Sequence, residues 1–187
     1  MGETDDDLVA RVARADHEAC RQLVERHLAR IVAFAARVLG NPAEAEDVAQ
    51  EVFTRVWTHA GSWQPGRARF TTWLFRVALN LCRDRLARRR EVPLDDALDP
   101  ADPAPTPAER LEVADVKRLV TQEVDALPER QRTALALCHY QGLRNIEAAE
   151  IMELSVEALE SLLARARRTL RERLSPLAPE LLEGARR

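Results

Sequence analysis

NIEAAEIMELSVEALESLLARARRTL, residues 145–170, is the stretch that decides the fold of the C-terminal part of the chain. Asn145 can cap a short helix that runs through Met152, and Leu154-Ser155 supplies a tight turn. The helix that follows places its apolar residues on one face: Val156, Leu159, Leu163, Ala166 and Leu170. A short helix, a tight turn and a longer basic helix form the helix-turn-helix arrangement of DNA-binding proteins.

The residues before this stretch complete a small helical domain. Residues 111–126 have helical periodicity, and Pro128 suits the first turn of the next helix. Gly142 can end that helix in the left-handed conformation. We therefore predict a C-terminal domain over residues 107–174, followed by a tail over residues 175–187 to which the sequence assigns no role.

A proline-rich and acidic segment precedes this domain. Residues 92–107 contain five prolines and four aspartates and almost no apolar periodicity, a composition that cannot form a packed core. The sequence predicts a flexible linker over residues 91–106. At ~3.3 Å per residue, sixteen extended residues reach about 50 Å, which is roughly fifteen base pairs of duplex. Two domains on such a tether could hold two separated DNA sites.

The N-terminal part predicts a second helical domain, over residues 5–90. Apolar stripes at helical spacing run through residues 23–39, 45–57 and 70–81, with a short helix expected near residues 6–15. Gly40-Asn41-Pro42 stops the first long helix, and residues 61–69 form a loop. The predicted fold class is all-α, with two small helical domains joined by a flexible Pro/Asp-rich linker.

Composition excludes several classes of function. The acidic N-terminus and the short apolar runs predict neither a secretory signal nor a membrane-inserted segment. Three scattered cysteines are unlike a disulfide framework and favour a reducing cytoplasm. His17-x-x-Cys20 and the adjacent Cys138-His139 do not make a four-ligand zinc set. No glycine-rich phosphate loop or catalytic grouping is present, so we expect no enzyme, no metal and no cofactor.

Three segments, in this order around the linker, resemble the extracytoplasmic-function (ECF) sigma factors of RNA polymerase, within the sigma-70 superfamily. They are EAEDVAQEVF (residues 44–53), FTTWLFRVALNLCRDRL (residues 70–86) and ALPERQR (residues 126–132). The resemblance implies a core-polymerase-binding helix, a helix that melts and reads the −10 element, and the start of a −35-reading domain. It also implies a stress-response specificity subunit whose partners are core polymerase, promoter DNA and an anti-sigma factor.

The resemblance also implies functional residues in the N-terminal domain. The acidic face of the first segment would bind polymerase through Glu44, Glu46, Asp47, Gln50 and Glu51. The alternative is that its acids only complement the helix dipole. The −10 set consists of Trp63, Arg76, Asn80, Arg83 and Arg85. Within it, Trp63 could stack on an extruded base, Asn80 could pair with a base edge and the arginines could hold phosphate. Trp73 lies on the apolar stripe and is expected in the core.

The −35 set lies on the last helix and consists of Glu160, Ser161, Arg165, Arg167 and Arg168. The arginines would bind phosphate, while Glu160 and Ser161 could read bases. Two positions depart from the family pattern. Glu153 stands in the turn where glycine is usual, which suggests a turn built differently if that position needs a positive φ. Glu160 and Leu162 stand where the family usually has lysine and arginine.

Two alternative functions fit the sequence taken without the resemblance. One is a helix-turn-helix regulator with an N-terminal helical sensing domain. The other is a helical adaptor that binds proteins only, which the acidic and aliphatic residues Glu160 and Leu162 would suit.

Overall fold

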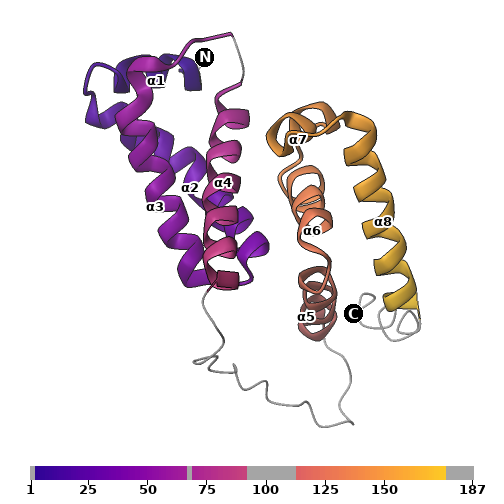
Figure 1. Ribbon diagram of the computed structural model, residues 1–187. Coiled ribbons are helices and arrows are strands. Elements are labelled where there is room, and N and C mark those ends of the chain that lie inside the picture. The colour runs from indigo at the N-terminus through magenta and orange to yellow at the C-terminus, as the bar shows by residue number, and fades with distance from the viewer. Residues whose placement is uncertain (1–2, 67–68, 92–112, 176–187) are drawn as a thin grey trace.

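A computed structural model describes residues 3–66, 69–91 and 113–175, and within these residues all regular structure is helical (Figure 1). The first domain contains α1 (Asp5–Val12), α2 (His17–Leu39), α3 (Pro42–His59), a 3-10 turn η1 (Ala60–Ser62) and α4 (Phe70–Glu91). The second contains α5 (Val113–Asp125), α6 (Glu129–Leu135), a π-helical turn η2 (Ala136–Tyr140), α7 (Asn145–Met152) and α8 (Val156–Leu174). The predicted all-α class is confirmed.

Local capping explains where the helices of the first domain begin and end. The side chain of Asp16 accepts hydrogen bonds from the N–H groups of Glu18 and Ala19 at the start of α2. Gly40 ends α2 at φ 66°, a conformation that costs glycine little. Asn41 caps α3, with Pro42 in its first turn. Each boundary follows from the sequence signals.

The helices of the first domain enclose a core to which α2, α3 and α4 contribute. Phe34 of α2 and Phe75 of α4 meet edge to face, with ring centroids 5.3 Å apart. Ile31, Val52 and Leu74 are fully buried beside them. This core holds α4 in a fixed orientation, so that one of its faces is available for a ligand.

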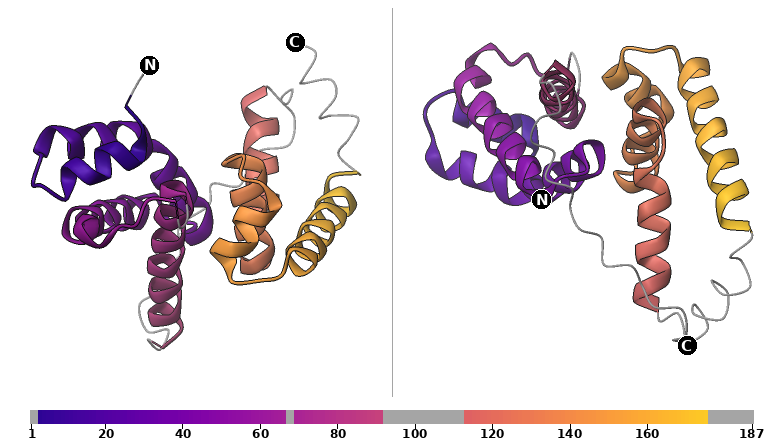
Figure 2. Two further views of the ribbon diagram at one scale, coloured as in Figure 1. Left: turned by 90° about the horizontal axis from the view of Figure 1, so that it is seen from above. Right: turned by 60° about the horizontal axis from the view of Figure 1, so that its bottom comes forward.

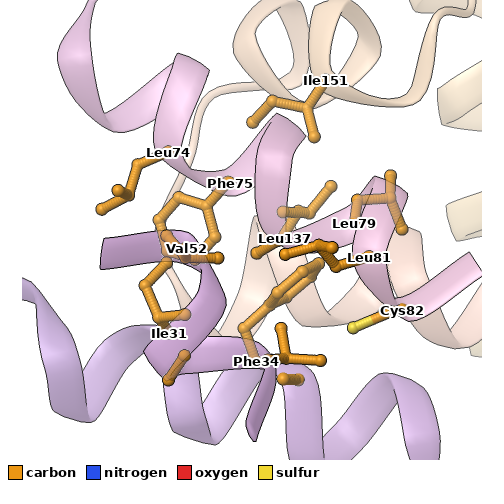
Figure 3. Close-up of a cluster of buried hydrophobic side chains, with 14 of the residues drawn as sticks. Ile31, Phe34, Val52, Leu74, Phe75, Leu79, Leu81, Cys82, Leu137 and Ile151 are labelled. Carbon is orange, nitrogen blue, oxygen red and sulfur yellow. The ribbon is translucent and has the colours of Figure 1, made fainter. Parts of the chain in front are cut away.

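The two domains lie side by side, and their apolar faces merge into one cluster (Figures 1 and 2). α7 lies along α4, whereas α6 and η2 lie against α2. Figure 3 shows Ile151 and Leu137 of the second domain facing Phe34, Phe75 and Leu79 of the first. All five side chains are buried. The sequence predicted two domains on a tether, and this contact between them was not foreseen.

One predicted boundary differs from the structure by a residue, and two predicted segments lie almost wholly outside the described residues. The structure begins α7 at Asn145, so the capping position belongs to Arg144, whose N–H donates to the Glu147 carboxylate (3.0 Å). The predicted cap was therefore one residue late. All but the first residue of the predicted linker (91–106) and of the tail (175–187) lie outside the described residues.

Glu153 does adopt the left-handed conformation, at φ 57°, in the turn between α7 and α8. The usual turn is thus retained with an unusual residue, because Leu154 N–H still reaches back to the Ala149 carbonyl (2.9 Å). A non-glycine residue in this region costs roughly 1–2 kcal/mol, part of which the lower chain entropy of the unfolded state offsets.

We predict that Glu153→Gly raises the free energy of unfolding by about 0.5–1 kcal/mol, because glycine relieves this backbone strain. Thermal unfolding followed by circular dichroism measures the change. Ala164→Gly, at an exposed position in the middle of α8, is the control and should lower the free energy of unfolding by about 1 kcal/mol. A loss of stability in Glu153→Gly would show that the turn is not strained.

Candidate nucleic-acid interface

A cavity of about 400 Å³ opens beside the start of α4, within the size range of sites that hold small ligands. Aromatic side chains line it together with a cation: Trp63, Phe70, Trp73 and Arg76. Trp63 meets Phe70 edge on, at a centroid distance of 5.8 Å, and Phe70 stacks on Trp73 at 5.9 Å. A cleft lined by aromatic rings beside a guanidinium suits an unstacked base and its phosphate.

Contacts from α1 hold the cavity in shape. The indole Nε1 of Trp63 donates to Asp6 (3.0 Å), which fixes the ring in the loop after α3. Asp5 lies 2.8 Å from the ring of buried His27, and that hydrogen bond holds the pKa of Asp5 below its usual range. Sequence reasoning assigned α1 no functional role. The structure makes it the support of Trp63.

The predicted −10 residues divide between two faces of α4. Arg76, Asn80 and Arg83 are spaced so that they share one face, and Asn80 is exposed there. Arg85 lies on the opposite side, 3.7 Å from Glu51 of α3. Trp63 and Arg76 meet at the cavity. Trp73, expected in the core, is only partly buried and contributes to the cavity wall.

The predicted polymerase-binding residues of α3 also fall into two groups. Glu46, Asp47 and Gln50 are exposed. Glu44 instead binds Arg89 of α4, and Glu51 binds Arg55 (2.8 Å) as well as Arg85. Both of these acids are half-buried, and they join α3 to α4. Three of the five side chains are therefore free to meet a partner, while two stabilise the first domain.

The predicted −35 residues lie on α8, on the outer side of the second domain (Figures 1 and 2). Ser161, Arg165 and Arg168 follow helical spacing along one exposed face, and Arg167 is also exposed. Glu160 accepts a hydrogen bond from the Asn145 side chain (3.2 Å). This contact links α8 to the start of α7 and occupies one oxygen of the Glu160 carboxylate.

The three cysteines are not among the candidate binding residues of α3, α4 and α8. Burial raises the pKa of Cys82 to about 12 and also raises the pKa values of Cys20 and Cys138. The thiols therefore stay protonated at neutral pH and are poor nucleophiles.

Within the described ranges, no group of three or more His, Cys, Asp or Glu side chains could hold a metal ion. No helix in that part of the chain is long and apolar enough to cross a bilayer.

Comparisons with known proteins identify the class. The Sigma-70 region 2 family matches residues 23–92, and the Sigma-70 region 4 family matches residues 117–170. These matches cover the domain that carries α3 and α4 and the domain that carries α7 and α8. The fold and the site thus define an initiation factor of the sigma-70 class.

Individual relatives narrow this class. The chain is 31% identical to RNA polymerase sigma-H factor of Pseudomonas aeruginosa, over 95% of this chain and 97% of that protein. It is 30% identical to ECF RNA polymerase sigma factor SigW of Bacillus subtilis, over 90% and 96%. The structure of CnrH in complex with the cytosolic domain of CnrY has a TM-score of 0.70 and 28% identity, over 93% of this chain and 99% of that one.

The chain therefore belongs to the ECF RNA polymerase sigma factors. It is a non-catalytic specificity subunit of RNA polymerase whose partners are the core enzyme and promoter DNA. The family assignment replaces both alternatives, the sensing regulator and the protein-only adaptor.

Proposed function

We propose that the cavity beside α4 receives a base extruded from the −10 element, while Arg76, Asn80 and Arg83 hold the melted strand. The observation that carries this proposal is the cavity itself, in which Trp63, Phe70 and Trp73 surround an opening next to Arg76. Melting a promoter breaks no covalent bond. It needs contacts that offset a few kcal/mol of lost stacking for each extruded base. Aromatic walls, a base-edge amide and cations are the groups that supply such contacts.

The exposed faces of α3 and α8 complete promoter recognition. Exposed Glu46, Asp47 and Gln50 on α3 bind a basic surface of core polymerase, and complementary charge sets the register of the two proteins. Ser161, Arg165 and Arg168 on α8 face the −35 major groove, with the arginines on phosphate and Ser161 close to the bases. Arg85 contributes to the −10 site indirectly, because its contact with Glu51 joins α3 to α4.

Control by an anti-sigma factor and action in the cytoplasm belong to the same proposal. RpoE of Bartonella quintana, which shares this fold at a TM-score of 0.64, forms a complex with the anti-sigma factor NepR. The CnrH complex contains a cytosolic domain of its partner. We expect this chain to be released from such a partner in a stress response.

In-vitro transcription tests the function directly. Core RNA polymerase reconstituted with this chain should initiate at discrete sites in a genomic library at which the core enzyme alone does not start. Permanganate reactivity of unpaired thymines should mark the −10 region of each site. If the reconstituted enzyme starts nowhere that core polymerase does not, the proposed assignment of all three surfaces fails.

A further inference from the structure

The charged side chains of α8 change sign along the helix. Its arginines all lie from the middle of the helix onward, whereas two of its three acids, Glu157 and Glu160, lie in the first two turns. In a helix-turn-helix motif, the N-terminal residues of the second helix contact base edges in the major groove. The acids of α8 are therefore placed where bases are read, while its arginines are placed to hold the backbone.

Glu157 serves the start of α8 itself. Ser155 caps the helix, and its hydroxyl accepts a hydrogen bond from the Ala158 N–H (3.2 Å). Hydrogen bonds from the Glu157 N–H and from the Ser155 side chain hold the pKa of Glu157 below its usual range. Its carboxylate is thus already engaged at the helix terminus, and Glu160 is the acid that remains.

Helix electrostatics do not account for Glu160. It is the fifth residue of α8, beyond the first turn in which the helix dipole favours an acid. The residues three and four positions away on either side include no cation that could pair with it: Val156, Glu157, Leu163 and Ala164. One of them, Glu157, carries the same charge. Glu160 therefore gains nothing from its own helix.

A side chain of the neighbouring helix holds the Glu160 carboxylate instead. α7 packs against α8 (Figure 1), and Asn145, the first residue of α7, donates from Nδ2 to Oε1 of Glu160 (3.2 Å). Leu159, next to Glu160, is fully buried and fixes the rotation of α8 about its axis. Among the described residues, the second oxygen of Glu160 has no hydrogen-bond donor. One oxygen is thus fixed in place, and the other can accept a hydrogen bond from a ligand.

A carboxylate can only accept hydrogen bonds, so it distinguishes the four bases in the major groove. Cytosine presents an amine there. Adenine presents an amine beside an acceptor nitrogen, whereas guanine and thymine present acceptor oxygens that repel a carboxylate. An acid at this position therefore favours cytosine, tolerates adenine and excludes guanine and thymine.

We propose that Glu160 selects a C·G base pair in the −35 element by accepting a hydrogen bond from the cytosine amine, and that Asn145 positions its carboxylate for this contact. The inference rests on the proposed placement of α8 in the −35 major groove. Lysine, which the family usually has at this position, pairs with guanine. This chain should therefore prefer a different base from relatives that carry lysine there.

The test is transcription of a promoter library by core polymerase reconstituted with the full-length chain. The promoter is one mapped by in-vitro transcription, its −10 region is kept and its −35 region is randomised, and barcoded transcripts are sequenced. At one −35 position, the wild-type holoenzyme should favour cytosine over guanine and thymine about tenfold. Glu160→Gln should move that preference to adenine, because an amide pairs with both edge groups of adenine, and Glu160→Lys should move it to guanine.

Matched controls separate base readout from charge. Glu172→Gln and Glu172→Lys make the same changes at an exposed position in the last turn of α8, and both should keep the preference for cytosine. Circular dichroism confirms that each variant is folded.

Asn145 is tested as a positioning residue. Asn145→Ala should lower the preference for cytosine about two- to fivefold, since one oriented hydrogen bond is lost. The same change in a Glu160→Ala background should alter no base preference, because Asn145 acts through Glu160. Asn145→Gln keeps the amide donor and should restore part of the preference.

Wild-type base preferences in both Glu160 variants would overturn the inference, and so would a uniform loss of transcription with unchanged preferences. In either case Glu160 only joins α7 to α8. The wild-type holoenzyme separates this failure from that of the proposed function. If it prefers certain bases in the −35 region while the Glu160 variants prefer the same ones, only the role of Glu160 is wrong. If it shows no base preference anywhere in that region, the placement of α8 at the −35 element is wrong.

Discussion

Asp47→Arg should weaken binding to core RNA polymerase on the order of 100-fold, corresponding to about 3 kcal/mol, because like charges placed face to face at an interface cost several kcal/mol. Asp47 is exposed near the start of α3, between Glu46 and Gln50. Its neighbours Glu44 and Glu51 are bound to arginines within the chain and cannot take over its role. Fluorescence titration of the labelled chain with core polymerase measures the loss.

The fold should tolerate this change. A cation near the N-terminal end of a helix costs only about 0.3–1 kcal/mol. Glu25→Arg provides the matched control, because it reverses one exposed acid on α2 outside the predicted surface. The control should bind polymerase normally. Normal binding by Asp47→Arg as well would remove the α3 surface from the proposal and leave its acids as dipole partners only.

Asn80→Ala should reduce open-complex formation about 10- to 100-fold while leaving polymerase binding intact, since one good base-edge contact contributes about 1–3 kcal/mol. Asn80 is exposed on α4, on the same face as Arg76 and one turn beyond it. Alanine is the better helix former, so the variant should be at least as stable as wild type. Its defect would then reflect a lost contact with DNA.

Permanganate footprinting and polymerase titration, performed in parallel, separate the two steps of initiation. Asp84→Ala is the control, because Asp84 is an exposed residue one turn further along α4. It should melt promoters like wild type. An equal loss of polymerase binding and melting in Asn80→Ala would show that Asn80 contributes to assembly and does not read a base.

Helix positions could be predicted because their signals are local. The start of α3 follows from Asn41 and Pro42, and the end of α2 from Gly40, each within one turn of the boundary. Glu153 shows the limit of such reasoning. Its side chain argued against a positive φ, yet the packing of α7 and α8 imposes that conformation. Tertiary contacts across a whole hairpin outweigh a local preference of about 1 kcal/mol.

Individual site residues were harder to place. The spacing of Arg76, Asn80 and Arg83 predicted a shared face, which the structure shows. Arg85, nine residues after Arg76, falls about half a turn round the helix from that face by spacing alone. The structure adds only its partner, Glu51 of α3. Trp73 fits an apolar stripe, and only the loop that brings Trp63 alongside makes it a cavity wall. These outcomes depend on residues far away in the sequence.

Taken by itself, the sequence determined the helices to within a residue or so of their ends, the division into two helical units and the family resemblance. All of these rest on interactions within a few residues of each other or on motifs read in order. Only the tertiary structure decided which charged side chains are free and which are bound, and that Glu150 of α7 joins the lining of the cavity beside α4. Ion pairs such as Arg76–Glu150 join residues 74 positions apart, and no periodicity along the chain encodes which distant surfaces bury their apolar faces together.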